Sequence, residues 1–344
     1  MLRIQFSVAD LARIRIAPRP DPLWELLLAV HLLRPQPGDL LFTRWRTEVT
    51  DRLRRAELGA PLQLLLSLMP HRGYFPDFLN PIAAIHGLDA GLEAIRATPK
   101  PRLTLDISRL AASRKLPDSV GPVAAGSSRA LAELSATMRI CYNLMILPYR
   151  RAMETAFEHD RGARLEAAAD DGVEGLLNSL LPFASWSPGE LRIPAHRDQE
   201  LRLDSRGLLL VPAYFCIGGP VTMYDPALPP VLVYPANPLP HLLPRSGSTP
   251  STALAALIGA TRAAVLDAVA TRHTSTTTEL ANHLANSMAS TSDHTRILRE
   301  AGLITSRRNR NRLIHQLSTL GHALLTTDPQ PRRGSTPTTG PEPA

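Results

Sequence analysis

Residues 274–317 read TSTTTELANHLANSMASTSDHTRILREAGLITSRRNRNRLIHQL, and this stretch decides the fold of the C-terminal part of the chain. It contains a short helix pattern, a break, a second helix pattern that ends at a glycine, and an apolar–basic–apolar ribbon. A helix, a turn, a second helix and a β-hairpin in this order place one helix in the major groove of DNA with the hairpin alongside. The stretch therefore predicts sequence-specific DNA binding.

The first helix of this stretch has a defined beginning and end. Thr276 and Glu279 have the spacing of a capping box, in which a hydroxyl and a carboxylate satisfy free backbone amides. Leu280 and Leu284 follow one turn apart and predict one apolar face. Asn286 stands where the chain must turn, because asparagine tolerates the left-handed backbone conformation well.

The second helix is predicted to begin near residues 288–290 and to end at Gly302, which suits the positive φ of a helix C-terminus. Ile297 and Leu298 are expected to face inward. The residues expected on the outer face, in contact with base edges or nearby phosphates, are Ser290, Thr291, Asp293, His294 and Arg296. Asp293 is expected to accept a hydrogen bond from a cytosine amino group or to repel misplaced phosphates.

A basic hairpin follows the second helix. Leu303 and Ile304 form one expected strand, and residues 313–317 contain the other. The expected tip, residues 306–312, carries four arginines suited to phosphate contact or minor-groove insertion: Arg307, Arg308, Arg310 and Arg312. Taken singly, a helix pair fits any all-α domain and an arginine run fits any solvated surface. Their order and spacing together favour DNA binding.

Four segments of this region resemble the ArsR-type winged helix-turn-helix family: residues 257–266, 278–281, 298–304 and 307–308. The resemblance implies base contacts from the helix over 288–301 and backbone contacts from the hairpin, called the wing. It also implies a homodimer on a palindromic operator, and repression rather than activation. Asn286 stands where many relatives have glycine. Residues 281–284 lack the Cys-x-Cys pair of metal-sensing members, so the resemblance implies a DNA-binding module without a thiolate metal site.

Composition favours a globular protein with a polyanionic partner. The 344 residues are enough for two or three domains, and 44% hydrophobic with 20% charged residues is ordinary for a soluble chain. A net charge of +7 favours a partner such as double-stranded DNA. Cys141 and Cys216 stand in apolar surroundings and are expected to be buried thiols. Because no apolar run reaches the ~20 residues of a membrane helix and no signal peptide is recognised, we expect a cytoplasmic location without membrane association.

The predicted fold class is mainly α with small β segments (α+β), in a large helical N-terminal domain followed by the winged helix. The domain over 1–234 has helix patterns over 22–33, 43–59, 127–149 and 165–181, and strand patterns over 201–203, 208–212 and 231–234. The remaining predicted parts are a proline-rich linker over 235–250, the winged helix over 251–326 and a disordered tail over 327–344.

The N-terminal domain also resembles a known type. Residues 73–81, 172–177 and 207–212 are similar to the domain that precedes this winged helix in many actinobacterial regulators. That resemblance implies architecture but no ligand; a role in sensing or dimerisation is our separate expectation for this domain. Two features leave alternatives open. The loop over 73–78 is expected to pack aromatics or to serve a ligand or interdomain role. Four aromatic residues are expected either to line an effector pocket or to pack in the core: Tyr214, Phe215, Tyr224 and Tyr234.

Enzymatic chemistry is not expected. The sequence has no GxGxxG, P-loop, HExxH or GxSxG motif. The carboxylates of residues 160–174 are typical of a charged helix surface, and the histidines near the winged helix are scattered, so we expect no catalytic site, metal or cofactor. The prediction is a DNA-binding repressor with an effector of unknown identity. The alternatives are a winged helix that docks other proteins and an enzyme with an accessory winged helix.

Overall fold

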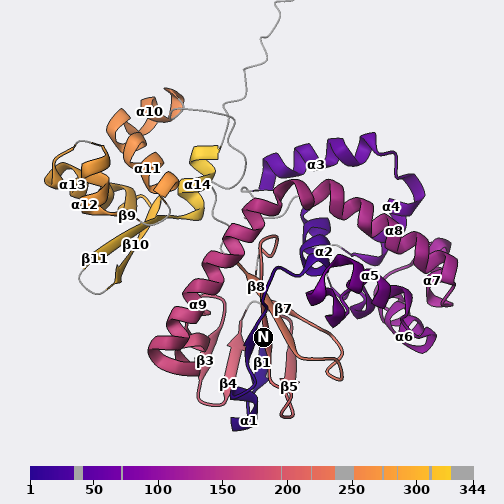
Figure 1. The fold of residues 1–344 in the computed structure, drawn as a ribbon. Helices are drawn as coiled ribbons and strands as arrows, with labels where there is room; N and C mark the ends of the chain where they lie inside the picture. The colour runs from indigo at the N-terminus through magenta and orange to yellow at the C-terminus, as the bar shows by residue number, and fades with distance from the viewer. Residues whose placement is uncertain are drawn as a thin grey trace, which may run out of the picture. The chain divides into compact units, whose positions relative to one another are not determined.

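The computed structural model describes residues 1–34, 42–70, 73–194, 196–217, 219–236, 252–272, 275–284, 286–309 and 312–326. The chain forms two compact units, Met1–Leu243 and Pro244–Ala344. Helices joined to small sheets make up both units, which confirms the predicted mainly α fold with small β segments (Figure 1). Residues 237–250 of the expected linker and the expected tail over 327–344 lie outside the described residues. Pro235, placed in that linker, instead ends a strand.

Helices form most of the N-terminal unit (Figure 1). The α-helices are α1 (Val8–Leu11), α2 (Pro22–Leu32), α3 (Thr43–Arg55), α4 (Gly59–Leu68), α5 (Leu88–Arg96), α6 (Lys100–Ala111), α7 (Gly121–Ala124), α8 (Ser128–Met145) and α9 (Arg150–Asn178). Short 3-10 helices are η2 (Asp77–Leu79), η3 (Ile82–His86), η4 (Asp118–Val120) and η5 (Leu147–Tyr149). Among the described residues, Ser128–Asn178 is long and apolar enough to cross a membrane, but half of its most apolar window is buried, as in a core helix.

Two four-stranded sheets complete this unit. One has the order β3-β4-β1-β5, from Ser185–Ser187, Glu190–Ile193, Leu2–Gln5 and Gln199–Arg202. The other has the order β2-β6-β8-β7, from Arg15–Ile16, Leu209–Ala213, Val231–Pro235 and Val221–Thr222. Strands β2, β6 and β8 are parallel, and every residue of β6 and β8 is buried. Continuous apolar runs are typical of such doubly covered strands, which explains why the sequence pattern located β6 and β8.

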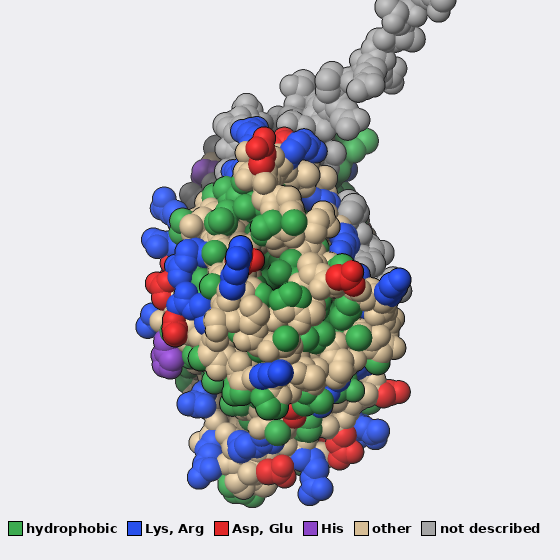
Figure 2. Space-filling model, turned by 90° about the vertical axis from the view of Figure 1, so that its right-hand side faces the viewer, with side chains coloured by type: hydrophobic (Ala, Val, Ile, Leu, Met, Phe, Trp, Pro, Cys, Tyr) green, Lys and Arg blue, Asp and Glu red, His purple; other side chains and the backbone are tan. Residues whose placement is uncertain are grey.

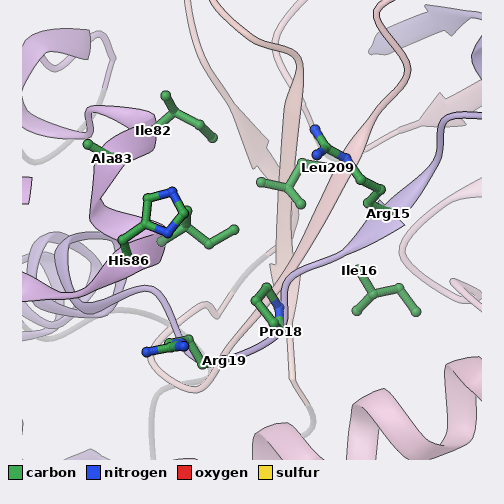
Figure 3. Close-up of a pocket in the computed structure, with 9 residues that line it drawn as sticks. Arg15, Ile16, Pro18, Arg19, Ile82, Ala83, His86 and Leu209 are labelled. Atoms are coloured by element: carbon green, nitrogen blue, oxygen red, sulfur yellow. The ribbon is translucent and has the colours of Figure 1, made fainter. Parts of the chain in front are cut away.

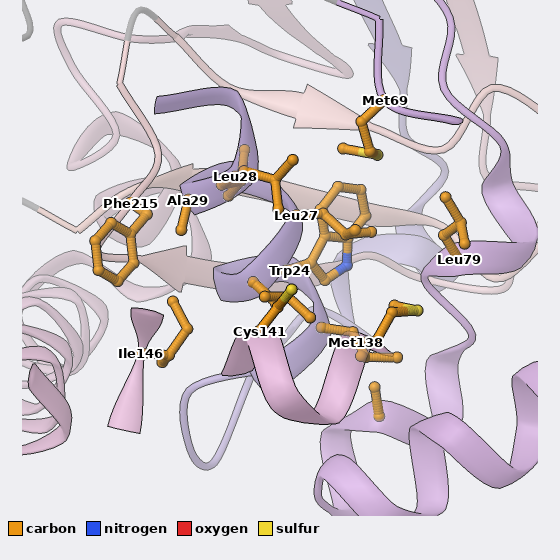
Figure 4. Packing of buried hydrophobic residues seen from close by; sticks show 14 of the residues in the cluster. Trp24, Leu27, Leu28, Ala29, Met69, Leu79, Met138, Cys141, Ile146 and Phe215 are labelled. Carbon is orange, nitrogen blue, oxygen red and sulfur yellow. The ribbon is translucent and has the colours of Figure 1, made fainter. Parts of the chain in front are cut away.

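Helix α2 lies at the centre of the larger core. Asp21 caps it by accepting hydrogen bonds from the amides of Leu23 and Trp24, both at 3.0 Å, and Pro22 supplies its first turn. A helix that is apolar on all sides must be covered on all sides. In Figure 4, Met138 and Cys141 of α8 lie on one side of α2, and Phe215 lies on another. Cys141 and Cys216 are buried free thiols, as expected.

One buried carboxylate joins α2 to the parallel sheet. Glu25 is 1% exposed, and its two oxygens accept hydrogen bonds from the amides of Tyr214, at 2.8 Å, and Phe215, at 3.0 Å. These amides follow the end of β6, where the ladder no longer supplies them with partners. Burial raises the pKa of Glu25 to about 8. Tyr214 and Phe215 are themselves buried, so they belong to the core and not to a pocket.

A second charged network holds the loop over 73–78. The guanidinium of Arg102 pairs with Asp77 and Asp106, each at 3.1 Å, and with Asp225. Asp77 also accepts hydrogen bonds from the amides of Tyr224 and Asp225, both at 2.9 Å. A partly buried guanidinium is stable when each of its three nitrogens is matched by a carboxylate in this way. The loop therefore has the structural role expected for it.

Positive and negative side chains are interspersed on the surface of the N-terminal unit. Figure 2 shows basic side chains spread over one face, with acidic and apolar side chains among them. Exposed pairs such as Arg129–Glu133 and Arg54–Asp51 neutralise part of the arginine excess. The net charge of +7 is therefore not concentrated on this face.

The glutamine variant Glu25→Gln is expected to reduce the pH dependence of stability between about pH 5 and pH 8. Burial raises the folded-state pKa above that of the unfolded chain, so the folded state binds the proton more tightly. The contribution of this proton to the free energy of unfolding is fully present below the pKa of Glu25 in the unfolded chain. It is lost as the pH rises through the pKa of Glu25 in the folded state. The wild type should lose free energy of unfolding across this window, and the variant should lose less. Denaturant titrations at a series of pH values measure the difference.

The matched control is Glu200→Gln, because Glu200 is an exposed glutamate on β5. We expect its pH profile to coincide with that of the wild type. Equal pH slopes for the wild type and Glu25→Gln would contradict the assignment of a raised pKa to the buried Glu25 carboxyl group.

Candidate nucleic-acid interface

The C-terminal unit has the element order of a helix-turn-helix followed by a hairpin (Figure 1). Its elements are α10 (Thr252–Ile258), α11 (Ala260–Arg272), β9 (Ser275–Thr276), α12 (Thr277–His283), α13 (Met288–Glu300), β10 (Ile304–Asn309), β11 (Arg312–Leu317) and α14 (Thr319–Thr326). The strands form one sheet in the order β10-β11-β9. A separate apolar core joins these elements, with Leu266 of α11, Leu280 of α12 and Leu298 of α13 in it.

The predicted capping box starts α12. The hydroxyl of Thr276 accepts a hydrogen bond from the amide of Glu279 at 3.3 Å, and the carboxylate of Glu279 accepts one from the amide of Thr276 at 2.9 Å. Leu280 is fully buried, as the pattern indicated. After the helix, the amide of Asn286 donates to the carbonyl of Ala281 at 3.0 Å, so the chain turns where the sequence predicted.

The second helix, α13, has the predicted boundaries. The hydroxyl of Ser287 accepts a hydrogen bond from the amide of Ser290 at 3.2 Å and caps the N-terminus. At the other end, Gly302 has a φ of +70°, and the amide of Leu303 donates to the carbonyl of Leu298 at 2.8 Å. Glycine adopts this left-handed conformation without strain, so it ends the helix and starts the hairpin.

One predicted contact residue on α13 lies on the wrong face. Thr291 is completely buried, so the expectation that it faces outward is wrong. Thr291, Thr295 and Leu298 repeat at the spacing of one helix face, and burial of Leu298 turns the two threonines inward with it. The Thr291 hydroxyl has no hydrogen-bond partner among the described residues.

The other four predicted residues of α13 reach the surface. Asp293 and Arg296 are exposed, and Ser290 and His294 are partly exposed. Arg296 is held by two carboxylates, with Asp293 at 2.7 Å and Glu300 at 3.0 Å. The Arg296 guanidinium lowers the pKa of Asp293. His294 Nε2 lies 3.2 Å from the Ser290 hydroxyl, and its Nδ1 has no partner among the described residues.

The hairpin strands are longer than predicted. Their register pairs Ile304 with Leu317 and Asn309 with Arg312. Arg307 and Arg308 lie on β10 and Arg312 lies on β11, whereas the sequence placed all three at the tip. The longer strands follow from the continuous backbone ladder, which includes these polar residues. Arg310 lies outside the described residues.

A histidine that the sequence did not single out joins the hairpin to α12. His315 on β11 is 1% exposed. Its Nε2 lies 2.9 Å from the hydroxyl of Thr277 on α12, and its Nδ1 lies 2.9 Å from the hydroxyl of Ser306 on β10. Burial, followed by the nearby charge of Arg299, lowers the pKa of His315. The neutral ring therefore positions the hairpin against the start of the first helix.

The Thr291→Val variant is expected to raise the free energy of unfolding by about 1 kcal/mol, because valine keeps the shape and removes an unsatisfied buried hydroxyl. Affinity for DNA should not change, since the side chain does not reach the surface. Thermal or denaturant unfolding and a DNA titration measure the two quantities.

As a control, Thr278→Val removes an exposed hydroxyl in the first turn of α12 and should change stability by less than about 0.5 kcal/mol. A Thr291→Val protein that is folded but has lost DNA affinity would show that the hydroxyl contacts DNA after all.

Comparison with known proteins agrees with this geometry. Residues 258–307 match a family described as a helix-turn-helix domain. The match contains α11, α12 and α13, so it covers the two helices, the turn between them and the helix that supports them. No curated protein sequence and no solved structure matches the chain. The C-terminal unit thus contains a helix-turn-helix DNA-binding domain, and the protein is a DNA-binding regulator.

Proposed function

We propose that the protein is a transcriptional repressor of the ArsR type, which binds operator DNA as a homodimer in the bacterial cytoplasm. The observation that carries this proposal is α13, a capped helix with a buried face and a polar exposed face, followed directly by an antiparallel hairpin. A recognition helix needs such a split, because one face must pack on its own domain while the other enters the major groove. The hairpin then serves as the wing.

The proposed base contacts come from the exposed face of α13: Ser290, Asp293, His294 and Arg296. Arg296 is the strongest candidate, because a guanidinium forms bidentate hydrogen bonds with guanine in the major groove. Its pairs with Asp293 and Glu300 must open when it turns toward a base. The exchange costs little, since exposed ion pairs are weak. Asp293, once released, is available to a cytosine amino group.

The proposed backbone contacts come from the wing. Three of its arginines lie on the paired strands, Arg307, Arg308 and Arg312, and Arg310 is included on the sequence alone. Neutralising phosphates releases counterions, so these residues are proposed to supply affinity without sequence preference. His315 supports this arrangement by holding both wing strands to α12.

The homodimer follows from the way such domains read DNA. One recognition helix contacts only a few base pairs, and a two-fold pair of helices doubles the site on a palindrome. The N-terminal unit has the size of an independent domain and is proposed to supply sensing or the dimer contact. We propose no catalytic role for it.

Selection of bound fragments from random genomic DNA, with the full chain at physiological salt, tests the proposal. An enriched palindrome would support an operator-binding dimer. Failure to enrich any sequence, with weak affinity for all DNA, would instead favour a winged helix that docks other proteins. Turnover of a small molecule at the N-terminal unit would favour the enzyme alternative.

The Arg308→Gln variant is expected to weaken binding to selected and unselected DNA alike, and to reduce the slope of log affinity against log salt by about one unit. The reason is the loss of one phosphate contact from β10. Fluorescence anisotropy at several salt concentrations measures the slope. The control is Arg55→Gln, an exposed arginine of α3. An unchanged slope in Arg308→Gln would refute the assignment of Arg308 to the backbone.

Glu300→Gln is expected to raise affinity for DNA about two- to fivefold at low salt, because it frees Arg296 from one carboxylate and removes a negative charge. The matched control is Glu133→Gln on α8, which breaks the same kind of exposed pair, with Arg129 at 2.9 Å. The control should leave affinity unchanged. An equal gain in both variants would show that only net charge matters and that Arg296 has no special role.

A further inference from the structure

The N-terminal unit has a pocket that the proposed DNA contacts do not use. Its volume is about 620 Å³, which is the size of a typical small-molecule site. It lies between β2, the edge strand of the parallel sheet, and the 3-10 helix η3 (Figure 3). Its lining residues are Arg15, Ile16, Pro18, Arg19, Ile82, Ala83, Ile85, His86 and Leu209.

The walls of this pocket are rigidly built. The amide of Arg15 donates to the carbonyl of Leu208 at 2.9 Å, and the amide of Ala17 donates to Leu210 at 2.8 Å, so β2 is fixed to β6. On the other side, the buried Ala84 of η3 packs on Gly91 of α5, where an added Cβ would meet the Ala84 Cβ at 2.9 Å. The pocket is therefore present before any ligand arrives, which lowers the cost of binding.

The chemistry of the lining is unusual for this protein. Most of the wall is apolar, and the polar groups are the cations Arg15 and Arg19 and the imidazole of His86, with no carboxylate among them. None of these three side chains forms a hydrogen bond or ion pair with a described residue. Arg102 and Arg296, by contrast, are each matched by carboxylates. Figure 3 shows His86 and Leu209 on opposite sides of the pocket, with Arg19 below them.

We propose that this pocket binds a small organic monoanion, a carboxylate with an apolar body. The isoleucine, proline and leucine side chains remove the apolar body from water. A free guanidinium, that of Arg15 at one end of the pocket or that of Arg19 at the other, supplies charge-assisted hydrogen bonds to the carboxylate (Figure 3). A cation is repelled by this lining, and a sugar or free phosphate has no apolar body to cover the apolar walls. The proposed binding site does not rest on the proposed function. In a DNA-binding regulator, the carboxylate bound there would be the signal.

Calorimetry with the full chain and decanoate, below its micelle concentration, tests the site. Decanol is the uncharged probe of the same length. We expect decanoate to bind saturably at one site per chain and decanol to bind roughly tenfold more weakly, because it lacks the charge-assisted bonds. The double variant Arg15→Gln/Arg19→Gln should bind decanoate roughly tenfold more weakly and decanol as the wild type does.

Two further variants separate the site from general effects. Arg55→Gln/Arg151→Gln removes two exposed arginines outside the pocket and should bind decanoate like the wild type. Ala83→Phe fills the apolar space and should weaken both probes, with circular dichroism showing that each variant is folded. Absence of saturable decanoate binding would overturn the proposal, as would equal binding of the two probes or an equal loss in both arginine pairs. No DNA is present, so this result and that of the operator selection are independent.

Discussion

The fold of the larger unit depends on one buried interaction, between the Glu25 carboxylate and the amides that follow β6. Helix α2 is apolar on nearly every side, so it has no polar face to specify its rotation about its own axis. Two directed hydrogen bonds fix that rotation, because a buried acceptor without its donors is costly. The helix is thereby held in register with the parallel sheet, and the aromatic pair Tyr214 and Phe215 is fixed in the core.

In the smaller unit, the same kind of constraint acts around the exposed helix. Caps at Thr276 and Ser287 start the two helices, Gly302 ends the second, and His315 joins the hairpin to the first. These contacts position α13 without using its outer face. The Arg296 pairs on that face are exposed and weak, so they can exchange for contacts to DNA. Stability and recognition therefore use different residues of one helix.

The helix-turn-helix could be predicted from the sequence because its signals are local. A capping box, a helix period and a terminal glycine each act over a few residues, and all three were found where predicted. The errors arose at positions that depend on packing. Thr291 has the composition of a surface residue, but Leu298 sets the rotation of the helix and takes Thr291 inward. The hairpin strands extend further than the apolar pattern predicted. Pairing with a neighbouring strand stabilises the extended backbone of polar residues, which have little strand propensity of their own.

Periodicity and local hydrogen bonding specify the mainly α class, the order of the C-terminal elements, the capping box at Thr276 and the buried runs of β6 and β8, so these features could be predicted from the sequence. The contacts between distant segments, by contrast, become visible only in the folded chain. Glu25 reaches Tyr214, His315 reaches Thr277, and Arg15 and His86 line one pocket. These long-range contacts depend on how the helices and strands pack. Local sequence patterns do not specify the distance between two segments that are far apart in the chain.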